Sequence, residues 1–252
     1  MTIVLLILII TIGCEFIDSY LGMMYGTILS PVLIIAGYDP KLVIPSILIS
    51  QAVGGAIASW RHNKLKNALI FKKDSEDFKI TLLIASLGIV ATLIGAFIGA
   101  SMISRIWLKN YIGILCLIMG GSVLLKISFS FSWGKMVILS IISAFNKAVS
   151  GGGYGPLMST GQIVVGRESK NSIVVTDFAE VPICLASFAV WVWINKWPNS
   201  PLIYILPIGA AIGGYLGPMA LKKSKSKEKI ARIVGALAFI LGIAILFFEV
   251  KG

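Results

Sequence analysis

Charged residues occur inside apolar stretches of this 252-residue sequence, where a charge is expensive and usually functional. Lys147 is the one cation placed deep in such a stretch. We expect it to attract an anion; in a second interpretation it forms a structural ion pair with Asp18. Asp177 and Glu180 are spaced one helical turn apart. Either carboxyl group is a candidate for carrying a coupling proton, or for hydrogen-bonding a neighbouring helix.

Glycines lie close to these charges. Gly151–Gly155 reads Gly-Gly-Gly-Tyr-Gly and is followed by Pro156. Three consecutive glycines disfavour a helix by roughly 1 kcal/mol each, so we predict a break there, and Pro156 suits the first turn of a new helix. A helix that begins inside the membrane presents unpaired N–H groups and a partial positive charge, which favour an anion. The other interpretation, that glycines only allow close helix packing, is the one we adopt for Gly95, Gly99, Gly209 and Gly213.

The pattern occurs twice. Shifting the sequence by 129 positions aligns nine identical residues in the 29 positions from Phe16 to Ile44. The same shift places Asp18 on Lys147 and Gln51 on Glu180. We therefore predict two copies of one unit, residues 1–127 and 128–252. The predicted anion-binding residues are Gly22, Tyr25, Gly26, Lys147, Gly151, Gly152, Gly153, Tyr154, Gly155 and Pro156, and the predicted coupling residues are Asp18, Gln51, Asp177 and Glu180.

The composition is that of a membrane protein. The sequence is 57% hydrophobic and 13% charged, against roughly 25% charged residues in soluble domains. Its net charge of +11 comes from Lys and Arg that lie almost entirely between apolar stretches, which indicates contact with membrane lipid and not with nucleic acid. Apolar stretches long enough to cross a bilayer as a helix recur along the chain; examples are Ile80–Ser104, Trp107–Leu125, Ser172–Ile194, Pro201–Leu221 and Ile230–Phe248.

Two further stretches, Met1–Ala36 and Lys135–Val165, are apolar for 36 and 31 residues, too long for one crossing. If each were one crossing, the basic loop residues would divide 10 to 11 between the two sides of the membrane. If each breaks into two half-length helices, 16 of the 22 basic residues lie on one side and five on the other, as the positive-inside rule expects. We therefore predict an all-α polytopic protein of two inverted repeats, each a broken half-helix pair, re-entrant or twice crossing, plus three transmembrane helices. Both termini should be extracytoplasmic.

The motif Gly151-Gly-Gly-Tyr-Gly-Pro-Leu-Met, with Gly166 beyond it, resembles the glycine-rich motif of the TauE/SafE sulfite exporter family. Gly22-Met-Met-Tyr-Gly-Thr-Ile-Leu-Ser-Pro31 resembles the first-repeat counterpart, although Met23 and Met24 replace glycines. The resemblance covers essentially the full chain. It implies a transporter of sulfur-containing anions or small organic acids, such as sulfite, sulfoacetate or other carboxylates.

These observations favour a secondary transporter that moves a small anion across the plasma membrane, with a proton as the candidate coupling ion. The alternatives are an anion or solute channel and a thiosulfate carrier that uses Cys14, Cys116 and Cys184 as ligands. The sequence contains no HExxH, GxSxG or GxGD motif and no CxxC pair, so we expect neither an enzyme nor a cofactor or metal site. The single histidine, His62, opens a basic loop, where we expect it to serve orientation or lipid contact.

Overall fold

The computed structural model describes residues 2–68, 70–125, 133–164, 169–223 and 228–247, and these residues form helices and connections without a strand. The helices are α1 (Thr2–Leu21), α2 (Tyr25–Ile35), α3 (Pro40–Lys64), α4 (Glu76–Phe97), the π-helical turn η1 (Ile98–Met102), α5 (Arg105–Leu124), α6 (Trp133–Ser150), α7 (Tyr154–Val164), α8 (Ser169–Asn195), α9 (Leu202–Lys223) and α10 (Glu228–Phe247). The predicted all-α class is confirmed for these residues. Gly166 and most of the predicted loops near 126–132, 165–168 and 224–227 lie outside them.

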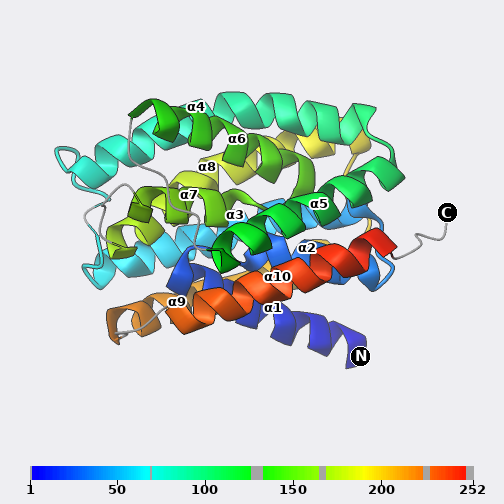
Figure 1. Cartoon of the computed structure of the whole chain (residues 1–252), viewed down its shortest axis with the longest axis horizontal. Helices are drawn as coiled ribbons and strands as arrows, with labels where there is room; N and C mark the ends of the chain where they lie inside the picture. The colour runs from blue at the N-terminus through cyan, green and yellow to red at the C-terminus, as the bar shows by residue number, and fades with distance from the viewer. Residues whose placement is uncertain (1, 69, 126–132, 165–168, 224–227, 248–252) are drawn as a thin grey trace.

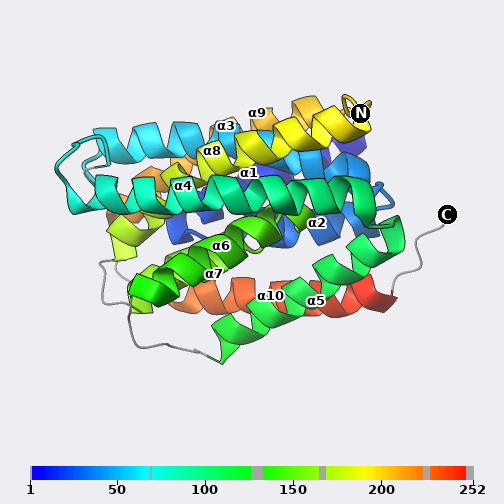
Figure 2. The same cartoon turned by 90° about the horizontal axis from the view of Figure 1, so that it is seen from above.

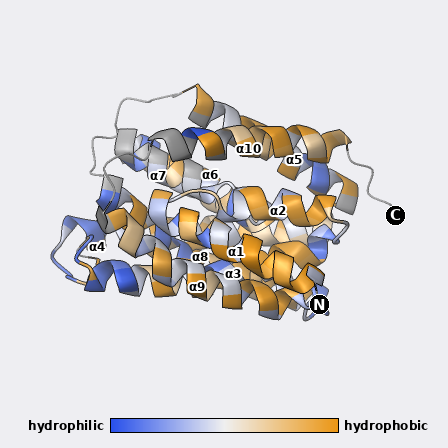
Figure 3. Ribbon diagram, turned by 90° about the horizontal axis from the view of Figure 1, so that it is seen from below, coloured by the Kyte–Doolittle hydropathy of each residue, from blue (hydrophilic) through white to orange (hydrophobic). Residues whose placement is uncertain are grey.

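Five of the described helices are long and apolar enough to cross a membrane. They are Thr2–Leu21, Pro40–Lys64, Glu76–Met102, Lys170–Asn195 and Leu202–Leu221. Shorter apolar helices occur at Tyr25–Ile35, Ile106–Ser122 and Gly235–Phe247. Figure 3 shows hydrophobic residues along the helices and a gathering of hydrophilic residues at the connection between α3 and α4. This distribution places the apolar part of the bundle in the bilayer and that connection in water.

The helices pack as a single bundle. α1 packs on α9, α6 packs on α4, α3 packs on both α8 and α9, and α5 packs on α10. In Figures 1 and 2 the start of α1 and the end of α10 lie at one end of the bundle, and the connection between α3 and α4 lies at the other. Chain segments far apart in the sequence therefore share one interior.

Glycines let these helices approach closely. A methyl group at Gly95 would lie 2.8 Å from the carbonyl oxygen of Phe145 on α6, and one at Gly213 would lie 2.6 Å from that of Ile12 on α1. Gly99 and Gly209 are similarly close to Val149 and Thr11, at 3.2 and 2.7 Å. The packing interpretation of these four glycines is confirmed.

Both predicted helix breaks are present. α1 stops before Gly22 and α6 stops before Gly151, and both glycines have φ of +74°. Glycine adopts this left-handed conformation without steric penalty. The amide of Gly22 donates to the Asp18 carbonyl at 2.6 Å, and that of Gly151 donates to the Lys147 carbonyl at 2.8 Å. Each helix thus ends in the same way at residues 129 apart in the sequence.

The lengths of the broken helices differ from the prediction of two half-length helices per break. α2 and α7 have 11 residues each, but α1 has 20 and α6 has 18. At about 1.5 Å per residue, α1 is long enough to cross the hydrocarbon core alone. In the first stretch the break comes after the midpoint, and in the second stretch α6 begins at Trp133, before the stretch does. The first turns of α1 expose Ile3, Leu5 and Leu6, and its buried residues concentrate toward the break.

Candidate functional site

The two helix breaks touch each other inside the bundle. A methyl group at Gly26 would overlap the carbonyl group of Gly151, and one at Gly155 would lie 2.5 Å from the carbonyl oxygen of Gly22. Two serine hydroxyls join the breaks. The Ser30 hydroxyl donates to the carbonyl of Ser150 at 2.9 Å, and the Ser159 hydroxyl donates to the carbonyl of Gly22 at 2.7 Å. The predicted glycines of both copies therefore meet at one place.

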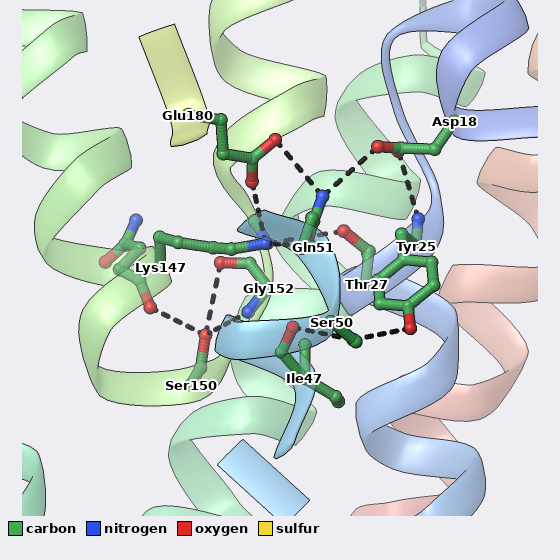
Figure 4. A network of polar contacts seen from close by, with 12 residues as sticks. Asp18, Tyr25, Thr27, Ile47, Ser50, Gln51, Lys147, Ser150, Gly152 and Glu180 are labelled. Carbon is green, nitrogen blue, oxygen red and sulfur yellow. Dashed lines mark hydrogen bonds and ion pairs between the residues drawn. The ribbon is translucent and has the colours of Figure 1, made fainter. Parts of the chain in front are cut away.

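A buried polar network lies beside this contact (Figure 4), and Gln51 on α3 is its centre. The Gln51 amide nitrogen donates to Asp18 Oδ2 and to Glu180 Oε2, each at 3.1 Å. Its carbonyl oxygen accepts a hydrogen bond from Lys147 Nζ. Lys147 Nζ also forms an ion pair with Glu180 Oε1 at 2.7 Å. Four of the predicted residues, from α1, α3, α6 and α8, are thus brought together.

The interpretation in which Lys147 pairs with Asp18 is wrong. Lys147 is 1% exposed and pairs with Glu180, and the Gln51 side chain lies between the lysine and Asp18. The primary amide can do this because it accepts from the ammonium through its oxygen and donates to both carboxyl groups through its nitrogen. Lys147 is therefore neutralised by an acid on α8 in this conformation.

The first turn of α2 already holds a carboxyl group. The Tyr25 amide donates to Asp18 Oδ1 at 3.0 Å, which places a carboxyl oxygen at the positive end of the α2 dipole. In the second break, the Gly152 amide donates to the Ser150 hydroxyl at 3.1 Å and the Gly153 amide to the Thr27 hydroxyl at 3.3 Å. No carboxyl oxygen among the described residues is hydrogen-bonded at the start of α7. Lys147 occupies the position there that aligns with Asp18.

The sequence model of the TauE/SafE sulfite exporters matches residues 5–245. The chain belongs to the TauE/SafE family. A Bacillus subtilis (strain 168) protein described as "Probable membrane transporter protein YtnM" is 26% identical over 255 residues, which cover 93% of this chain and 80% of YtnM. No solved structure matches the chain. Family and relative identify a multi-pass membrane transporter, and the relative's description as a transporter agrees with a non-enzymatic role.

The remaining predicted residues of this TauE/SafE chain lie around the same centre. Tyr25 and Tyr154 begin α2 and α7 and are fully buried. The Tyr25 hydroxyl is hydrogen-bonded to the Ser50 hydroxyl at 2.6 Å, and the Tyr154 hydroxyl has no hydrogen-bond partner in the described part of the chain. Pro156 lies in the first turn of α7, as predicted from the preference of proline for the start of a helix. Asp177 is one turn before Glu180 on α8 but does not join the network around Gln51.

His62 contradicts the prediction of a loop residue that serves orientation or lipid contact. α3 continues to Lys64, and the His62 side chain is completely buried. Its Nε2 lies 3.4 Å from Asp177 Oδ2 and 3.1 Å from the Ser19 carbonyl oxygen. A sequence signal was available, because His62 follows Gln51 by 11 residues, close to three helical turns, and so lies on the same face.

Glu15 is a functional candidate that the predicted set of site residues omitted. Its side chain is 2% exposed, and Oε2 has no hydrogen-bond partner among the residues that the structure describes. With Asp18, Asp177 and Glu180, it makes four buried carboxyl groups on α1 and α8, one of which pairs with Lys147. Four ionised carboxylates with one ammonium would leave uncompensated charge in a medium of low dielectric constant. The cluster therefore holds more acidic groups than this one ammonium group can neutralise.

Proposed function

We propose that this chain is a secondary transporter that moves a small anion across the plasma membrane together with protons. The anion class is sulfite, a sulfur-containing organic anion or a small carboxylate. The observation that carries the proposal is that the two breaks have residues of opposite type at aligned positions, an acid in the first and a lysine in the second. Asp18 supplies a carboxyl group to the start of α2, whereas the aligned residue ahead of α7 is the cation Lys147.

The transported anion is therefore assigned to the start of α7. The half-helix ends of both breaks carry partial positive charge, but only that of α2 is already occupied by a carboxyl group among the described residues. The Gly152 and Gly153 amides donate to hydroxyl groups, which an anion would have to replace as the acceptors, and the lysine adds a full charge. Gly22, Tyr25 and Gly26 belong to the neighbouring break, and Pro156 lies in the first turn of α7.

Glu180 links the anion to the proton in this proposal. Its carboxylate pairs with Lys147 Nζ at 2.7 Å, so it competes with a transported anion for the same ammonium group. A proton bound to Glu180 weakens that ion pair, and the freed N–H groups of Lys147 then bind the anion. Loss of the proton restores the ion pair and expels the anion. Gln51 extends the effect to Asp18, because its amide contacts both acids.

Two inverted copies, residues 1–127 and 128–252, would expose this site alternately to the two sides of the membrane. Helix packing supports this arrangement. By the shift of 129 residues and by helix order, α1 corresponds to α6, α3 to α8 and α4 to α9. The α1–α9 and α6–α4 pairs are therefore counterparts, as are the α3–α9 and α8–α4 pairs, and all four pairs are in contact. The start of α1 lies with the connections α2–α3, α4–α5 and α8–α9 at one end of the bundle (Figure 1).

Both termini are predicted to be extracytoplasmic. A phosphatase fused after residue 252 should be active and a fluorescent protein fused there should be dark, because the first folds outside the cytoplasm and the second inside. Fusions in the connection between α3 and α4 serve as the control and should give the opposite pattern, since that connection carries Lys66, Lys72 and Lys73. A cytoplasmic C-terminal fusion would overturn the inverted arrangement.

The function itself is tested with purified protein in liposomes. Sulfite, thiosulfate, sulfoacetate, taurine and small carboxylates are offered with and without a pH gradient. We expect saturable uptake of at least one anion, faster when the gradient drives protons in the same direction. Non-saturable flux would indicate a channel, and movement of cations alone would refute the proposal. Loss of thiosulfate transport on replacing all three cysteines by serine would favour the cysteine-dependent carrier.

A further inference from the structure

We propose that His62 and Asp177 form the proton entrance that connects the α3–α4 end of the bundle to Glu180. This inference rests on the proton-coupled transport proposed above and adds the route by which the proton arrives. Neither residue belongs to the network around Gln51, and both are more than nine-tenths buried. They connect the last turns of α3 to the first third of α8.

The contacts of His62 indicate which of its two ring nitrogens carries the proton when the ring is neutral. The Asn67 amide nitrogen lies 2.9 Å from His62 Nδ1 and also donates to the Pro218 carbonyl at 3.2 Å. Because an amide nitrogen only donates, Nδ1 is the accepting nitrogen and the ring proton is assigned to Nε2. That proton points to the Ser19 carbonyl at 3.1 Å, with Asp177 Oδ2 at 3.4 Å. A small rotation of the ring moves it from one oxygen to the other.

Asp177 provides the acceptor. Its Oδ2 is buried without a hydrogen-bond partner among the described residues, although it lies beside a ring N–H group. Buried carboxyl oxygens normally have partners, so an oxygen of this kind next to an imidazole is suited to receive a proton. Glu180 follows three residues later on the same face of α8. The three groups form a series from the end of α3 to the ion pair of Lys147.

The transfer balances as a relay through the imidazole. A proton from water at the α3–α4 end binds Nδ1 as Asn67 withdraws, and the ring becomes a cation. The Nε2 proton then passes to Asp177 Oδ2, which leaves a neutral ring protonated at Nδ1. Asn67 can turn its amide oxygen toward Nδ1–H. The ring resets when Nε2 takes up one proton from water and Nδ1 releases one to water, so the reset itself moves no net proton. Histidine suits this role because its two nitrogens exchange protons near neutral pH.

Among these contacts of the His62 ring within the described residues, Asp177 is the acidic one, and the other neighbours are carbonyl and amide groups. α1 contributes the Ser19 carbonyl, and α9 contributes the Pro218 carbonyl through Asn67. On α3 itself, Arg61 turns to the Met219 sulfur and lies over the Tyr215 ring, and Lys64 lies over Trp60. These cations sit at the predicted cytoplasmic end, where protons would enter or leave.

The test separates net proton movement from anion exchange in liposomes. Net uptake driven by a pH gradient requires the proton route. Exchange of labelled for unlabelled anion at equal acidic pH does not, because the carrier keeps its proton. We expect His62→Gln and Asp177→Asn to lower gradient-driven uptake at least about tenfold and to leave exchange within about twofold of the wild type. Ser187→Ala, which removes a buried α8 hydroxyl without a partner in the described structure, is the matched control and should change neither flux.

The outcomes are distinct. Equal loss of both fluxes in a folded variant assigns the pair a structural role and overturns the inference. Failure of both variants to fold overturns it as well, because the pair then serves stability. If only His62→Gln misfolds, Asp177→Asn alone must show the split between the two fluxes. If the wild type exchanges no anion, the proposed function fails instead, which this design reveals before any variant is compared.

Discussion

Replacing Lys147 by methionine is expected to abolish anion transport and to destabilise the folded protein. The lysine is 1% exposed and pairs with Glu180 at 2.7 Å. Methionine keeps much of the length but removes the charge, which leaves the carboxyl group buried beside an unpaired Gln51 oxygen. Breaking a buried ion pair from one side costs about 3–5 kcal/mol. Thermal unfolding in detergent and flux in liposomes measure the two effects.

The double variant Lys147→Met with Glu180→Gln separates binding from stability. Removing both charges should recover most of the lost stability, since no uncompensated charge remains. Transport should stay absent, because the ammonium that binds the anion is missing. Transport restored in the double variant would make the lysine only a structural partner of Glu180. Wild-type anion affinity in folded Lys147→Met would reject its binding role directly.

Adding one methyl group at Gly26 is expected to prevent the two helix breaks from meeting. The new carbon would overlap the Gly151 carbonyl and lie 2.9 Å from Gly152 Cα. Both neighbours are backbone atoms that are held by helices on either side, so neither can move away alone. Overpacking of this kind costs typically 1–3 kcal/mol and sometimes more. We expect Gly26→Ala to give little folded protein, measured by size-exclusion chromatography and thermal unfolding, and Gly155→Ala to behave alike.

Gly13→Ala is the matched control in an adjoining helix. Gly13 lies within α1, and a methyl group there meets no atom within 4 Å. Because alanine is favoured over glycine in a helix interior by about 1 kcal/mol, this variant should be as stable as the wild type or more so. If Gly26→Ala unfolds at the same temperature as Gly13→Ala, the close contact of the two breaks does not exist in the folded protein.

The sequence was sufficient for the features that depend on local rules. Apolar length predicted three of the described crossing helices, within 80–104, 172–194 and 201–221. The glycines at Gly22 and Gly151–Gly153 predicted where helices stop, because backbone conformation there is decided within a few residues. The repeat also predicted that Gln51 and Glu180 are counterparts. Their direct hydrogen bond was beyond reach, since it depends on how α3 and α8 pack.

The errors concern contacts made across the bundle. From the sequence, Lys147 could pair with an acid on α1 or on α8. Only the packing of the helices determines that it pairs with Glu180 and that Gln51 lies between it and Asp18. His62 reads as a loop residue because basic residues surround it, yet the last turn of α3 directs its ring inward to Asp177. Glu15 was omitted from the predicted site residues for the same reason. Its burial follows from α9 covering α1 at Gly213, where a methyl group would lie 2.7 Å from the Glu15 Cβ.

The coupling of an anion to a proton at the Lys147–Glu180 ion pair can be followed through the internal pH of liposomes. An anion gradient is applied at equal pH on both sides, using a sulfonate that stays ionised and so does not cross as a neutral acid. Coupled transport predicts that inward anion movement acidifies the lumen in wild-type liposomes, and that liposomes with Lys147→Met or without protein show no change. Saturable anion uptake with constant internal pH would contradict coupling at this ion pair.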